Sequence, residues 1–163
     1  MNLTLGTVDV GGSRSSMAMI AAEELGIPYE QVRANIADTT SLGHNDMTEG
    51  SRGTFSSGMA TVFAARDAIG VLKQRAAKMW GITEEHVIWE NGQAIATGDS
   101  HGNLPPLSLK EIAAKSGRTG GPIAGHNEVV ADGAGMGFAS HICDVEVDPC
   151  LLYTSDAADE WLR

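Results

Sequence analysis

The sequence has few cysteines and few positive charges, and each shortage excludes a class of protein. Among its 163 residues are 2 cysteines, Cys143 and Cys150, too few for a disulfide framework and without the spacing of a metal site. Lys and Arg number 11 against 21 Asp and Glu, which gives a net charge of −10. Because an acidic surface repels phosphate backbones, we expect no nucleic-acid partner.

Long apolar runs are also missing. No stretch approaches the roughly 18 uninterrupted apolar residues of a membrane-spanning helix, so no membrane span is expected. Residues 1–12 lack the basic flank and the apolar stretch of a signal peptide, and a cytoplasmic location is predicted. An apolar content of 42% and a mean hydropathy of −0.08 are typical of a globular protein, and the length fits one domain.

Glycine is abundant, with 20 residues. Some of these glycines belong to a first predicted unit, which consists of a strand, a turn, a helix and a second strand. Residues 3–10 alternate as a strand does, and a Gly- and Ser-rich turn follows over residues 11–16. Apolar residues then recur at helical spacing over residues 17–25 and stop at Gly26. Residues 32–36 indicate a second strand.

A second unit begins with an irregular segment over residues 37–53, too long to be a simple connection. A long helix is predicted after it, capped by Thr54, Ser56 or Ser57 and closed by Gly81. Its expected apolar stripe consists of Phe55, Met59, Val62, Ile69, Leu72, Ala76 and Met79.

The remaining sequence predicts short elements. Residues 87–90 and 93–96 form a hairpin around an Asn-Gly turn. Ser108 and Glu111 have the spacing of a capping box before a short helix. Residues 123–130 are weakly typical of a strand, and residues 138–147 alternate clearly enough to predict one.

The first glycine-rich turn has the chemistry of an anion site. Gly11 and Gly12 let a ligand approach the backbone, and the next helix offers unpaired N–H groups and the positive end of its dipole. The Ser13 hydroxyl and the Arg14 guanidinium add donors for a phosphate. The alternative is a tight turn with an exposed arginine, because the pattern matches neither a P-loop nor a dinucleotide fingerprint.

A second loop repeats this chemistry directly before the long helix. Its candidate binding residues are Thr48, Gly50, Ser51, Arg52 and Thr54. Alternatively, Arg52 pairs with a carboxylate of its own loop, Asp38, Asp46 or Glu49. Two such loops in one small unit favour an extended anionic cofactor over a single phosphate.

No set of residues predicts a catalytic centre or a metal site by itself. The five histidines are scattered and form no closely spaced pair, which favours surface or core positions over metal binding. Cys143 lies on a predicted strand and is expected to be a small buried side chain. Asp38 is either a base or a carboxylate that organises its loop.

In their order, these motifs resemble the molybdenum hydroxylases, the family of xanthine dehydrogenase, aldehyde oxidase and aerobic carbon monoxide dehydrogenase. The resemblance rests on DVGGSRSS, AAEELG, the Asp38-Thr39 step, GSRGT before a long Ala-rich helix, and ICDVEVDP. It covers residues 1 to about 149 and corresponds to the second molybdopterin-binding domain of the large subunit. It implies an α+β fold with mixed sheets and helices packed on them.

The resemblance implies that both loops hold a molybdenum–molybdopterin cofactor, in the family often as a dinucleotide such as the cytosine form. The implied contacts are Gly11, Gly12, Ser13, Arg14, Thr48, Gly50, Ser51, Arg52 and Thr54. The family's first turn reads Gly-Gln-Gly, whereas Gly12 stands here in place of the glutamine. This departure favours a divergent branch that acts on aldehydes or N-heterocycles.

The family are oxidoreductases that hydroxylate a carbon of a small-molecule substrate with oxygen from water, and a glutamate acts as the base. That glutamate lies further along the family's chain. Electrons leave through iron-sulfur clusters and commonly FAD. The implied partners are therefore the rest of the large subunit, an iron-sulfur small subunit and a flavin subunit.

Residues 150–163 do not continue the family's pattern. They resemble the translation of a sequencing adapter, so residues 1–149 are predicted to be a partial domain with a non-native tail. The alternative is a genuine acidic tail. Two other readings of the chain stay open at this point: a freestanding nucleotide- or anion-binding module without redox activity, and a structural domain.

Overall fold

The computed structural model describes residues 1–37, 40–42, 44–45, 47–98, 103–133, 135–147 and 149–150. The predicted α+β class is confirmed: a two-stranded and a three-stranded sheet are combined with helices. The elements are β1 (Asn2–Leu5), α1 (Ser13–Leu25), η1 (Tyr29–Gln31), β2 (Arg33–Ile36), α2 (Arg52–Trp80), η2 (Glu84–His86), β3 (Val87–Glu90), β4 (Gln93–Ala96), β5 (Leu107–Ser108), α3 (Leu109–Ala114) and α4 (Ser116–Thr119).

The first unit has the predicted order of strand, helix and strand. β1 and β2 pair in parallel, with Leu3 opposite Ala34, and α1 connects them. Helix α1 ends where predicted, at Gly26 in a left-handed conformation with φ +67°. The first strand is shorter than predicted, because β2, its partner among the described strands, ends at Ile36, opposite Leu5.

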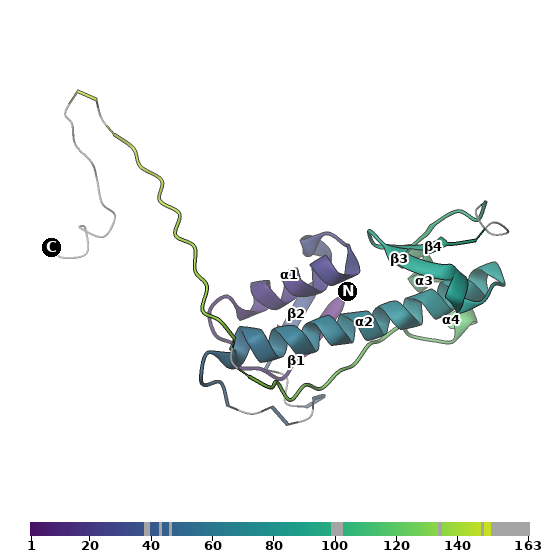
Figure 1. The fold of residues 1–163 in the computed structure, drawn as a ribbon, viewed down its shortest axis with the longest axis horizontal. Helices are drawn as coiled ribbons and strands as arrows, with labels where there is room; N and C mark the ends of the chain where they lie inside the picture. The colour runs from purple at the N-terminus through teal and green to yellow at the C-terminus, as the bar shows by residue number, and fades with distance from the viewer. Residues whose placement is uncertain are drawn as a thin grey trace.

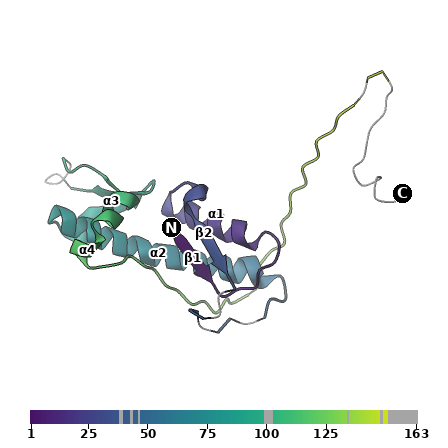
Figure 2. The same cartoon turned by 180° about the vertical axis from the view of Figure 1, so that it is seen from behind.

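Helix α2 is the longest element, and the other elements pack along it (Figure 1). Helix α1 lies beside its N-terminal half, and the β3–β4 hairpin, α3 and α4 lie around its C-terminal half (Figures 1 and 2). One hydrophobic cluster accordingly joins α1, β1 and β2, and a second joins the C-terminal half of α2 to the hairpin and α3. Within the described ranges, no helix combines the length and the apolarity needed to cross a membrane.

The buried face of α2 differs from the predicted stripe. It consists of Gly58, Thr61, Ala65, Leu72, Ala76 and Ala77, of which the sequence analysis identified Leu72 and Ala76. Small side chains occupy the half that faces α1, since they allow the two helices to approach closely. The other predicted stripe residues are half-buried.

The predicted hairpin and capping box are both confirmed. Asn91 and Gly92 take the positive φ values, 49° and 76°, that a tight hairpin turn requires. This turn touches the end of α1: a Cβ added at Gly26 would lie 2.6 Å from the backbone nitrogen of Gly92. The Trp89 indole nitrogen donates to the Leu25 carbonyl at 3.0 Å. The hairpin thus satisfies one of the last carbonyls of α1.

The capping box of α3 makes part of the stability depend on pH. Hydrogen bonds from the Ser108 side chain and backbone lower the pKa of Glu111 below its ordinary value of 4.5. The ionised carboxylate therefore stabilises the folded state above this value, and its contribution is lost as the pH falls through the lowered pKa. Glu111→Gln keeps a hydrogen-bond acceptor but does not titrate.

In urea unfolding of the chain, we expect the parent protein's advantage over Glu111→Gln to be greatest near neutral pH. It should shrink below about pH 4.5, because only the parent carboxylate becomes protonated. An advantage that stays constant with pH would show that ionisation of Glu111 contributes nothing.

The two strands predicted near the C-terminus are wrong. No strand is assigned within residues 123–130 or within the described part of residues 138–147, and the latter run is extended and leaves the body of the protein (Figures 1 and 2). Phe138 is 93% exposed, and Cys143, expected to be buried, is exposed too. The alternating pattern is present, but a strand also needs a neighbour, and none of the described strands pairs with this run.

Candidate functional site

The two glycine- and serine-rich loops meet at one cavity of about 240 Å³. The first loop reaches it from the turn before α1, and the second from the turn before α2. The cavity is lined by Thr7, Val10, Gly11, Gly12, Ser13, Ser16, Met17, Thr48, Ser51, Gly53, Thr54 and Ser57. Ser13 and Ser51, on separate loops in the sequence, therefore share one site.

The N-terminus of α1 reaches the cavity without a side-chain cap. Gly12 precedes the helix with φ +84°, a left-handed conformation that a side chain would strain. The Ser13 N–H donates to the Val10 carbonyl at 3.0 Å, and the Ser16 N–H makes the first helical bond, to Gly12. No acidic residue lies in the first turn, so no side-chain charge there offsets the positive end of the helix dipole.

The N-terminus of α2 is built in a similar way. Gly50 and Ser51 both have positive φ, 57° and 58°, and they turn the loop into a helix that begins at Arg52. The predicted caps at Thr54, Ser56 or Ser57 are wrong: Ser51 is the N-cap residue, and its side chain makes no capping hydrogen bond. The first turn of α2 also contains no acidic residue. Two helix N-termini thus converge on one cavity.

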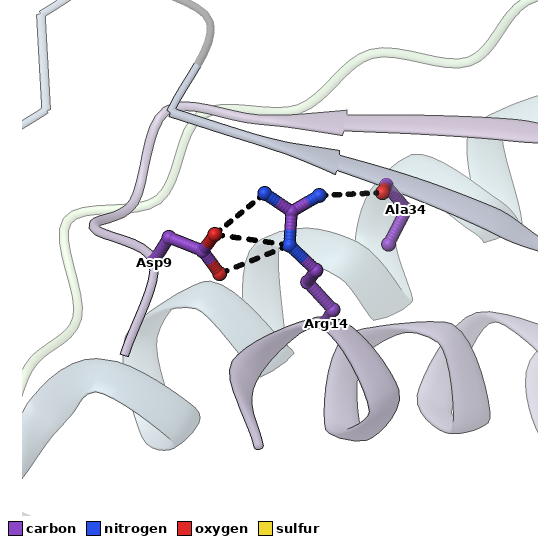
Figure 3. Close-up of polar contacts among 3 residues, drawn as sticks. All are labelled: Asp9, Arg14 and Ala34. Atoms are coloured by element: carbon purple, nitrogen blue, oxygen red, sulfur yellow. Dashed lines mark hydrogen bonds and ion pairs between the residues drawn. The ribbon is translucent and has the colours of Figure 1, made fainter. Parts of the chain in front are cut away.

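Arg14 forms an ion pair with Asp9 (Figure 3). Arg14 is not among the residues that line the cavity. Its Nη2 lies 2.5 Å from Asp9, its Nε lies 3.0 Å from both Asp9 carboxylate oxygens, and its Nη1 donates to the Ala34 carbonyl at 3.4 Å. The hydrogen bond with Asp9 and the charge of Asp9 raise the pKa of Arg14. The contact with Ala34 connects the first loop to β2. The guanidinium that the sequence predicted to bind a phosphate is therefore already paired with Asp9.

Seven hydroxyl-bearing side chains line the cavity, together with apolar surface, and none of the lining side chains is ionisable. Its hydroxyl groups belong to Thr7, Ser13, Ser16, Thr48, Ser51, Thr54 and Ser57. A ligand there meets neutral hydroxyl donors and the N-terminal turns of two helices, a combination suited to a negatively charged oxygen-bearing group. In the described ranges, no group of three His, Cys, Asp or Glu side chains is placed to hold a metal ion.

The structure brings most of the predicted site residues together. Gly11, Gly12, Ser13, Thr48, Ser51 and Thr54 line the cavity. Arg14, Gly50 and Arg52 adjoin it in the chain but are not among the lining residues. Asp38, which the sequence left as either a base or a loop-organising carboxylate, lies outside the described residues, as do Thr39 and Asp46.

Sequence reasoning did not single out half of the lining, namely Thr7, Val10, Ser16, Met17, Gly53 and Ser57, although Ser16 and Gly53 lie within the two candidate loops. One of these had a usable signal. Thr7 continues the alternation of Leu3 and Leu5, and all three residues are buried, although β1 itself ends at Leu5. Val10, Met17 and Ser57 are identified only by the structure.

A second, larger cavity of about 480 Å³ lies among β1, α2, α3 and residues 123–125. Its walls are mostly apolar, with side chains such as Leu3, Ala65, Leu72 and Ile123. Neither glycine-rich loop reaches it, so the smaller cavity is the candidate site.

Comparison with known proteins agrees with this geometry. The model of the molybdopterin cofactor-binding domain family matches residues 1–154. The carbon monoxide dehydrogenase large chain of Hydrogenophaga pseudoflava is 34% identical over 96 residues, which are 58% of this chain and 12% of that protein.

Solved structures of related enzymes share the fold. A Cu,Mo-CO dehydrogenase is 31% identical with a TM-score of 0.59, over 68% of this chain and 14% of that one. The reconstituted CO dehydrogenase from Oligotropha carboxidovorans is 29% identical with a TM-score of 0.58, over 68% and 13%. Quinoline 2-oxidoreductase from Pseudomonas putida 86, at 22% identity, shares the fold with a TM-score of 0.59 over 71% of this chain and 14% of its own.

This chain thus spans only 12–14% of the length of these relatives. Over that part, the family model, the sequence identity and the fold all point to the family that the order of the motifs resembles. The chain belongs to the molybdopterin cofactor-binding domain family of the molybdenum hydroxylases.

Proposed function

We propose that this chain is a piece of the catalytic large subunit of a molybdenum hydroxylase, and that its two loops hold part of a molybdenum–molybdopterin cofactor. The observation that carries the proposal is the convergence of both loops and both helix N-termini on one cavity. The proposed reaction is the hydroxylation of an aldehyde or N-heterocycle carbon with oxygen from water. It follows the family resemblance and the departure at Gly12.

The donor set of the cavity fits such a cofactor. Hydroxyl groups and backbone N–H groups at helix N-termini suit phosphate and other oxygen acceptors, and the lining contains no carboxylate to repel an anion. The cavity of about 240 Å³ is smaller than the roughly 300–1,000 Å³ of a whole ligand site. We therefore assign it one part of the cofactor and assign the other walls to regions outside this chain.

When bound, the cofactor supplies the redox chemistry, and the residues of this chain bind and orient it. Ser13 and Ser51 offer hydroxyls from opposite loops, while Gly11 and Gly12 let the ligand lie against the backbone. The Arg14–Asp9 pair holds the first loop in place beside it. That Gly50 and Arg52 contact the cofactor stays a prediction. That the native sequence ends at residue 149 stays a prediction too.

The remaining parts of the enzyme belong to the proposal as well. The base, the substrate funnel and most of the cofactor's surroundings come from the rest of the large subunit. Iron-sulfur clusters and FAD, carried by a small and a flavin subunit, take up the electrons. A cytoplasmic location completes the proposal.

Metal and pterin content test the proposal directly. We expect the full-length gene product, purified with its partner subunits, to contain molybdenum by elemental analysis and pterin by fluorescence after oxidation, in equal amounts. The reading frame in the source DNA should also continue past codon 149. A preparation without molybdenum and pterin that binds simple nucleotides would instead identify a freestanding nucleotide-binding module.

A further inference from the structure

Two polar residues are buried in the described part of the chain, Thr7 and Thr61, and they differ in one respect. The Thr61 hydroxyl donates to the Ser57 carbonyl at 2.7 Å and lies 3.7 Å from the Met17 sulfur. The Thr7 hydroxyl makes no hydrogen bond with any other described residue, although Thr7 is only 7% exposed. A polar group that stays unpaired in the folded state costs free energy, so a partner for it is expected.

The position of Thr7 indicates where that partner comes from. Thr7 follows β1 and lines the cavity together with Ser13 of α1 and Ser51 of the second loop. In the described ranges, Arg75 Nε is the only side-chain atom that is sealed from solvent and has no hydrogen-bond partner. The Thr7 hydroxyl, which also has no partner, is therefore not sealed from solvent, and the cavity is the space that Thr7 lines.

We propose that Thr7 is a cofactor-binding residue whose hydroxyl donates a hydrogen bond to an oxygen acceptor of the anionic cofactor. This inference rests on the proposed function and adds a contact that neither glycine-rich loop provides. The neighbouring donors, at the two helix N-termini, favour negatively charged oxygen at this place. Thr7 adds a donor from a third element, the segment that follows β1.

The test compares cofactor retention in variants of the full-length enzyme purified with its partners. Thr7→Val has nearly the same shape and lacks the hydroxyl, whereas Thr7→Ser keeps it. We expect Thr7→Val to lose molybdenum and pterin about tenfold faster during dialysis, which corresponds to about 1.4 kcal/mol. Thr7→Ser should lose them at nearly the parent rate.

Thr61→Val is the matched control. It removes the other buried threonine hydroxyl, which is satisfied within α2 and does not line the cavity. It should leave the rate of cofactor loss unchanged, even where it shifts the melting temperature. A loss as fast as in Thr7→Val would overturn the inference, since general loosening of the helices would then explain both.

Failure of the inference and failure of the proposed function give different results. A parent enzyme without molybdenum and pterin contradicts the proposed function. A parent enzyme that contains both, with a folded Thr7→Val variant that keeps them equally long, contradicts only the role of Thr7 and leaves ordered water as its partner. Should the valine variant not accumulate as folded protein, Thr7→Ala must lose the cofactor faster than Thr7→Ser.

Discussion

Ser13→Asp is expected to reduce the molybdenum and pterin content of the full-length enzyme at least tenfold while leaving its fold intact. Ser13 is the first residue of α1 and lines the cavity, in a first turn without acidic residues. A carboxylate there places a negative charge where the cofactor brings its own. Two like charges at about 4 Å near a protein surface repel by about 4 kcal/mol, more than enough for a tenfold loss.

The effect of this charge on stability has the opposite sign. Asp in the first turn of a helix stabilises it by about 0.3–1 kcal/mol through the helix dipole, so the cofactor-free variant should unfold no more easily than the parent. Ser13→Asn has nearly the same shape as Ser13→Asp without the charge and should keep most of the cofactor. Equal losses in both variants would mean that size, rather than charge, excludes the cofactor, and would contradict an anion site.

Local patterns were sufficient for a large part of the fold. The Asn91-Gly92 turn and the Ser108–Glu111 capping box depend on residues within a few positions of each other, and the structure contains both. The convergence of the two loops was also predictable, because each precedes a helix and both repeat the same chemistry. The family resemblance supplied the nature of the ligand, which spacing alone left open.

The errors came from interactions between distant segments. The run over residues 138–147 has a strand's alternation, but a strand needs a neighbour that its own residues do not specify. The hydrogen bond from Arg14 to the Ala34 carbonyl depends on how the first loop folds back toward β2, whereas the Asp9 partner is local and was overlooked. The buried face of α2 depends on the approach of α1, which favours Gly58 over bulkier residues nearby.

Gly58→Leu is expected to separate the two helices whose N-termini form the site. A Cβ added at Gly58 lies 3.1 Å from the Ile20 Cδ1 atom of α1, closer than ordinary van der Waals contact. The flexible end of Ile20 can move aside for the single carbon of Gly58→Ala. Three further carbons have no room between the packed helices, and overpacking of this kind costs about 1–3 kcal/mol.

Gly70→Leu is the matched control for Gly58→Leu. It is the same substitution in the same helix, at a position where an added Cβ meets nothing within 4 Å. Both variants gain the same amount, a little less than the roughly 0.8–1 kcal/mol that separates glycine from alanine, because glycine is a poor helix former. The difference between their free energies of unfolding in urea therefore isolates the cost of crowding and should be about 1–3 kcal/mol. Because crowding at Gly58 also moves α1 away from α2, its full-length variant should retain less pterin than the Gly70 variant. Equal stability and equal pterin content would mean that close packing of α1 on α2 does not hold the site together.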